Sequence, residues 1–135
     1  MNKLVFIVED DPVHQKMLEV HFEELGSYAV RTYTNPEDMM NHLHEKPFAI
    51  VLDHFFGIRK TGLDYLKELK KRKLGIPVIY YTTLTDPGII SEIESLGVER
   101  FIQKDSASLV RLRTALDALN EKSTKKGFLG KLFGR

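Results

Sequence analysis

The sequence contains no cysteine, which excludes a disulfide framework and any metal site built on thiolates. It also has no apolar run that approaches the ~20 residues needed to cross a bilayer. The first residues show neither the charged start nor the cleavage site of a signal peptide. We therefore expect a cytoplasmic protein.

A strong charge of either sign is also missing, because the formal net charge is +1. The charge is unevenly placed, since residues 121–135 carry five basic residues and one acid. The remaining residues 1–120 have a net charge of −3. This mildly acidic body is not typical of a nucleic-acid-binding surface, so we expect no nucleic-acid partner.

The chain has 135 residues, of which 42% are hydrophobic and 29% charged, as in an ordinary soluble domain. This length supports one hydrophobic core. We expect one domain over residues 1–121, followed by a basic tail over residues 122–135 that is amphipathic or disordered.

Five short apolar runs alternate with segments of helical periodicity, and they cover residues 3–8, 28–33, 48–53, 77–82 and 99–103. Three of them are almost continuously apolar, as strands buried on both faces of a parallel sheet must be. The pattern predicts an α/β fold: a five-stranded parallel sheet with helices on both faces, doubly wound and flavodoxin-like, (βα)5.

Capping residues agree with this pattern. Asp11, Asn35 and Asp86 each precede a proline, which predicts an N-cap followed by proline at the first helical position. Ser106 is the expected N-cap of the last helix. For Asp11 this capping role is preferred to a role as a metal ligand.

Polar side chains follow four of the predicted strands at their carboxyl ends, and they are Glu9, Asp10, Asp53, Thr82 and Lys104. In open α/β sheets, ligands bind beyond these strand ends. Three carboxylates packed together stay ionised only if a cation binds or one takes up a proton. Oxygen ligands without cysteine or histidine favour a hard cation, so we expect Mg²⁺. The alternative is a solvated acidic cluster at the start of a helix.

Residues 3–120 resemble the receiver domain of two-component response regulators, the family that includes the bacterial chemotaxis motor regulator. The resemblance rests on IVEDDP, on VLD ending at Asp53, on VIYYTT and on FIQKD, in family order. It implies that Asp53 accepts a phosphoryl group while Glu9 and Asp10 hold Mg²⁺. By the same resemblance, the backbone carbonyl of Phe55 is a further metal ligand.

The resemblance also assigns a switch. Thr82 and Lys104 contact the phosphoryl group, and Phe101 is the aromatic residue that changes position as Thr82 moves. Judged alone, Phe101 fits core packing better than a switch, and only the family pattern makes the two interpretations equal. Thr82 could also be a plain strand residue. His54 adjoins Asp53 but is expected to point to the opposite side of the strand.

The resemblance implies a stand-alone signalling switch that accepts its phosphoryl group from a sensor histidine kinase or a histidine phosphotransfer protein. It would act on a downstream protein and would not be a turnover enzyme, since it catalyses transfer to its own Asp53 only. Two alternatives stay open. One is a docking module that is never phosphorylated, and the other is a Mg²⁺-dependent phosphatase that works through an aspartyl phosphate.

Two segments depart from the family pattern. Asp105 stands where proline usually follows the lysine, and the run from Asp53 to Gly62 is one residue longer than usual. Phe55 is expected to shield the acyl phosphate from water and so slow its hydrolysis.

The tail has an apolar face at helical spacing, made by Phe128, Leu129, Leu132 and Phe133. One interpretation is a disordered end. The other is a segment, residues 125–135, that folds on weak contact with a membrane or a partner protein.

Overall fold

The computed structural model describes residues 2–57 and 59–132. Its elements, in chain order, are β1 (Lys3–Val8), α1 (Pro12–Glu24), β2 (Tyr28–Tyr33), α2 (Pro36–Met40), the 3-10 turn η1 (Leu43–Glu45), β3 (Ala49–Leu52), α3 (Gly62–Arg72), β4 (Val78–Thr82), α4 (Pro87–Ser95), β5 (Arg100–Gln103) and α5 (Ser108–Leu132). All strand pairs are parallel, in the order β2-β1-β3-β4-β5. The predicted fold class is confirmed.

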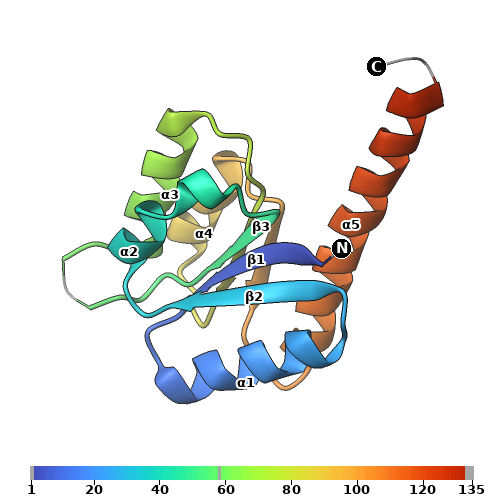
Figure 1. The fold of residues 1–135 in the computed structure, drawn as a ribbon. Helices are drawn as coiled ribbons and strands as arrows, with labels where there is room; N and C mark the ends of the chain where they lie inside the picture. Colours follow the sequence, from blue (N-terminus) through green and yellow to red (C-terminus); the bar gives the residue numbers. More distant parts are fainter. Residues whose placement is uncertain (1, 58, 133–135) are drawn as a thin grey trace.

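The sheet separates two apolar layers, because successive side chains of a strand point to opposite faces. Val5 and Ile7 of β1 pack in the cluster that includes α1 and α5. Phe6 and Val8 pack in the other cluster, with residues of α2, α3 and α4. Figure 1 shows the same division, with α1 and α5 on one side of the sheet and α2, α3 and α4 on the other.

Three helices begin as the sequence predicts. The side chain of Asp11 accepts hydrogen bonds from the backbone of α1, and Asn35 and Asp86 do the same for α2 and α4. The prediction for Ser106 is wrong. Asp105 performs this role instead, because its carboxylate accepts from the Ala107 N–H at 2.9 Å, and its carbonyl accepts from the Ser108 N–H.

Helix α5 is much longer than the sheet requires. Its buried residues end at Leu119, yet the helix continues to Leu132 and projects away from the body (Figure 1). The expected boundary between residues 121 and 122 therefore falls inside a continuous helix. Of the expected apolar tail face, Phe133 lies outside the described residues. Within residues 2–57 and 59–132, none of the helices has the length and apolarity to span a membrane.

Candidate functional site

Three carboxylates meet at the carboxyl ends of β1 and β3. One oxygen each from Glu9, Asp10 and Asp53 lies within 4.8 Å of the others. Glu9 and Asp53 are buried, whereas Asp10 is exposed. The sheet brings them together because β1 and β3 are parallel neighbours, with Val8 opposite Leu52 in the register. The juxtaposition expected from the sequence is present.

Lys104 brings positive charge to this cluster from the end of β5. Its Nζ donates to Glu9 Oε1 at 3.0 Å and to Asp53 Oδ2 at 3.1 Å. The ammonium group also lies 5.3 Å from the centre of the Tyr81 ring, within the range of a cation–π contact. The lysine is held in place by its backbone, whose N–H donates to the Thr82 carbonyl at 2.8 Å.

The two buried acids, Glu9 and Asp53, differ in the direction in which their pKa values are shifted. Burial, together with the nearby Asp53 carboxylate, raises the pKa of Glu9 to about 7. Burial also opposes ionisation of Asp53, but polar contact with Glu9 and Thr82 outweighs it, and the Lys104 charge adds to this effect. The pKa of Asp53 is therefore lowered, and Asp53 is the acid that stays ionised near neutral pH.

One carboxylate oxygen of the cluster is left without a partner. Oε2 of Glu9 is buried and accepts no hydrogen bond from the residues that the structure describes. An unpaired buried carboxylate oxygen is costly, and a bound cation would remove that cost. The donor set consists of oxygens, which suits Mg²⁺.

His14 belongs to the site, although the sequence analysis gave no histidine a role there. Its Nδ1 lies 2.8 Å from Glu9 Oε1, and its ring packs at 5.8 Å from the Tyr81 ring. The pKa of His14 is lowered, chiefly by burial and then by the Lys104 charge. The sequence does carry an indication of this role: His14 lies in the first turn of α1, and α1 starts directly after the acids.

Behind Asp53, a second set of contacts joins the site to β4 and β5. His54 points away from the acids, as expected, and its Nδ1 lies 2.7 Å from the Tyr80 hydroxyl. The Tyr80 ring is stacked on Phe101, with centroids 5.8 Å apart and an interplanar angle of 14°. Phe101 is half-buried against the core, and Thr82 is fully buried with its hydroxyl accepting from the Leu84 N–H.

Comparison with known proteins decides the family. The sequence-family model of the response regulator receiver domain matches residues 5–117 of this chain. The chain belongs to this family. Receiver domains act in phosphorylation-dependent two-component signalling and generally bind Mg²⁺, and the acidic cluster of this receiver domain stands where such an ion would sit.

Relatives of this receiver domain are themselves response regulators. A probable C4-dicarboxylate response regulator, DctR, of Halalkalibacterium halodurans is 27% identical over 119 residues, which are 87% of this chain and 51% of that protein. The signal receiver domain of a putative LuxO repressor protein from Vibrio parahaemolyticus has the same fold. Its TM-score is 0.83 at 18% identity, with 96% of this chain and 98% of that chain covered.

A DNA-binding response regulator of the LuxR family from Staphylococcus aureus has a TM-score of 0.76 at 25% identity, covering 87% of this chain and 98% of that one. The chain spans about half the length of the DctR regulator that it matches. The expectation of a stand-alone, chemotaxis-type regulator stays a prediction. The expectation that no nucleic acid is a partner has no support from these relatives.

The loop after Asp53 is fixed at both ends. The His54 N–H donates to Asp53 Oδ1 at 2.6 Å, and the Gly62 N–H donates to the His54 carbonyl at 2.8 Å. A Cβ on Gly62 would overlap the Asp53 carbonyl oxygen and lie 2.6 Å from the Tyr80 hydroxyl. Glycine is required here by close packing.

Lys104, Asp105 and Phe55, which belong to the two departures from the family pattern, lie among the described residues. The Lys104–Asp105 peptide bond is trans, since no cis bond occurs among residues 2–57 and 59–132. The Phe55 side chain is 48% exposed, and its ring packs edge-on against His54 at 5.0 Å. The role of the Phe55 carbonyl as a metal ligand stays a prediction.

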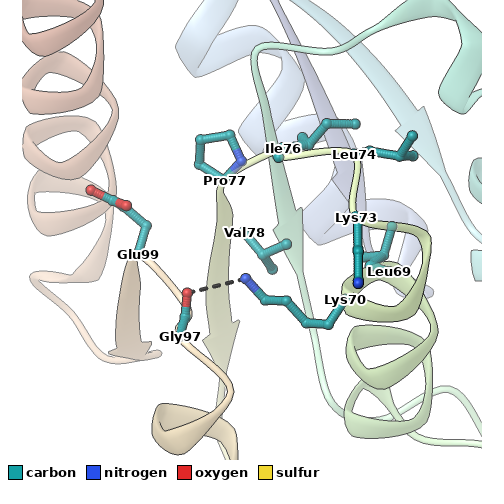
Figure 2. A pocket seen from close by; sticks show the side chains of 10 residues that line it. Leu69, Lys70, Lys73, Leu74, Ile76, Pro77, Val78, Gly97 and Glu99 are labelled. Atoms are coloured by element: carbon teal, nitrogen blue, oxygen red, sulfur yellow. Dashed lines mark hydrogen bonds between the residues drawn. The ribbon is translucent and has the colours of Figure 1, made fainter.

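A separate cavity of about 410 Å³ lies between the end of α3 and the starts of β4 and β5, lined by Lys70, Pro77 and Val78 among others (Figure 2). Lys70 crosses it and donates to the Gly97 carbonyl at 3.2 Å. Because this cavity lies at the amino ends of the strands, it is remote from the acidic cluster. It is not the candidate site of this receiver domain.

Proposed function

We propose that this chain is a signalling switch in which Asp53 accepts a phosphoryl group from a sensor histidine kinase or a histidine phosphotransfer protein. The observation that carries the proposal is the Asp53 carboxylate, which is buried, ionised and 3.1 Å from the Lys104 ammonium. In the transfer, an Asp53 oxygen forms the new bond to phosphorus while the bond from phosphorus to the donor imidazole nitrogen breaks.

Glu9, Asp10 and Asp53 would hold the Mg²⁺, with the Phe55 carbonyl as a further ligand by resemblance to the family. When bound, the ion supplies charge neutralisation for the incoming phosphoryl oxygens. Lys104 would release its contacts with Glu9 and Asp53 in part and bind a phosphoryl oxygen. Its cation–π contact with Tyr81 holds the ammonium at the site meanwhile.

Thr82 would donate a hydrogen bond to another phosphoryl oxygen. In the unphosphorylated structure its hydroxyl accepts from the Leu84 N–H, so its movement would change the start of the loop that follows β4. Phe101 would then repack, and its present stacking on Tyr80 is the arrangement that such a movement would alter. The result is a population shift between two packed conformations, and a downstream partner binds one of them in preference to the other.

On this proposal the protein is not a turnover enzyme, and it works in the cytoplasm. A docking module that is never phosphorylated remains the main alternative, favoured by Asp105 and by the unusual loop over residues 54–62. A phosphatase ranks lower, because such enzymes usually carry a second aspartate two residues after the nucleophile, where this chain has Phe55.

Intact-protein mass spectrometry tests the proposal. The protein is incubated with Mg²⁺ and acetyl phosphate, and we expect one phosphoryl adduct that Asp53→Asn abolishes. Asp11→Asn is the matched control, because asparagine caps a helix as well as aspartate and the adduct should persist. An absent adduct in the wild type, with Mg²⁺ bound normally, would favour the docking module. Sustained release of inorganic phosphate from unrelated phosphomonoesters would favour the phosphatase.

A further inference from the structure

The outer part of α5, residues 122–132, carries exposed apolar side chains that the receiver core does not use. Phe128, Leu129 and Leu132 are 63%, 49% and 63% exposed. The last α5 residue buried in the core is Leu119, so these three residues lie beyond the reach of the sheet. Figure 1 shows this part of the helix standing clear of the domain.

The exposed residues form a face of their own. Phe128 and Leu132 are four residues apart and Leu129 adjoins them, so all three lie on one side of the helix. At 3.6 residues per turn, this side is rotated by roughly 130° from the stripe that faces the core. It is therefore not a frayed continuation of the core stripe, and it needs a different covering.

Lysines lie on and beside this face: Lys125 is on the same side of the helix as Phe128 and Leu129, and Lys122 and Lys131 flank that side. Residues 122–132 contain no acid and four lysines, which are Lys122, Lys125, Lys126 and Lys131. Long lysine side chains can lie along apolar surface and keep their ammonium groups in a polar layer. An exposed apolar face with lysines on it and at its two edges is complementary to a bilayer whose headgroups are anionic.

We propose that residues 122–132 bind the surface of an anionic lipid bilayer, with this outer part of α5 lying in the headgroup layer. A second copy of the chain is a poorer occupant. Three side chains of this size offer on the order of 500 Å² per copy, or about 1,000 Å² for two copies, whereas a stable interface buries about 1,200 Å² or more in total. The lysines of two copies would also repel each other.

The arrangement leaves the phosphoacceptor site free. Helix α5 starts just after β5, near Lys104, and returns along the sheet toward the amino ends of the strands. In Figure 1 its outer part stands clear of the sheet. Asp53 lies at the opposite edge, so a kinase could reach it while α5 rests on a bilayer.

Vesicle co-sedimentation of the full chain tests the proposal. Vesicles of phosphatidylcholine are compared with vesicles that contain one-third phosphatidylglycerol. We expect binding at least about tenfold tighter to the anionic vesicles, since each lysine near such a surface contributes about a fivefold gain. Lys125→Gln combined with Lys126→Gln should lose about tenfold or more of this affinity.

Phe128→Ser tests the apolar face, and Val110→Ser is the matched control. Val110 is 68% exposed on the same helix but lies outside residues 122–132. We expect Phe128→Ser to abolish sedimentation with vesicles and Val110→Ser to leave it unchanged. Equal binding by wild type and Phe128→Ser, or no preference for anionic vesicles, would overturn the proposal. So would a dimer in analytical ultracentrifugation that Phe128→Ser dissociates while the wild type ignores vesicles.

Discussion

Nδ1 of His14 lies 2.8 Å from Oε1 of Glu9, so an imidazole from the first turn of α1 orients an acid at the end of β1. Groups that contact metal ligands in this way commonly change metal affinity 10- to 100-fold when removed. We expect His14→Ala to weaken Mg²⁺ binding by about tenfold, measured by isothermal titration calorimetry. His42→Ala, outside the acidic cluster, should bind Mg²⁺ like the wild type. Equal affinity in both variants would contradict an orienting role.

Gly62→Ala should destabilise the fold. The added Cβ would overlap the Asp53 carbonyl oxygen and approach the Tyr80 hydroxyl, so the start of α3 must shift. Forcing atoms into a packed interior costs about 1–3 kcal/mol, which urea unfolding would detect. Gly127→Ala is the control, because a Cβ there meets nothing within 4 Å. A Gly62→Ala variant as stable as the wild type would show that the backbone around Gly62 can shift without loss of stability.

The buried pair of His54 and Tyr80 predicts a non-additive double mutant. Tyr80→Phe removes the partner of His54 Nδ1, and an unpaired buried polar group costs about 1–3 kcal/mol. His54→Phe should cost a similar amount by leaving the Tyr80 hydroxyl unpaired. The double variant should lose clearly less than the sum of the two in urea unfolding. Strict additivity would mean that the hydrogen bond contributes nothing to stability.

Phe55→Asn should shorten the lifetime of the phosphorylated protein. The half-exposed Phe55 ring follows two residues after Asp53, and an apolar group there limits the approach of water to an acyl phosphate. We expect several-fold faster loss of the adduct, followed by intact mass after the phosphodonor is removed. Phe56→Leu is the comparison, because Phe56 instead packs against the Tyr65 ring. An unchanged half-life in Phe55→Asn would refute shielding.

The sequence predicts the acidic cluster well for a topological reason. Once the strands are recognised as parallel, the carboxyl ends of all of them must lie at one edge. Glu9, Asp53 and Lys104 therefore come together even though they are far apart in the chain. The N-caps at Asp11 and Asp86 follow as directly, because capping depends only on residues two or three positions away.

The contacts that the sequence does not predict depend on side-chain direction and local competition. His14 reaches Glu9 because of where α1 starts, which a strand-end argument does not consider. Ser106 has the chemistry of a cap, but Asp105 precedes the turn and takes the role. The pairing of His54 with Tyr80 joins a loop residue just after β3 to a residue of β4, and their meeting depends on register and rotamer.

The close contact between Gly62 and the Asp53 carbonyl oxygen fixes the position at which α3 begins. Because the start of α3 is packed directly against the Asp53 backbone, α3 has no room to move closer to Asp53. Earlier in the same loop, Gly57 has a φ of 101°, a backbone conformation that favours glycine. Substitutions at Phe55 or Phe56 should therefore alter the surface beside Asp53 while the Asp53 backbone stays held by α3.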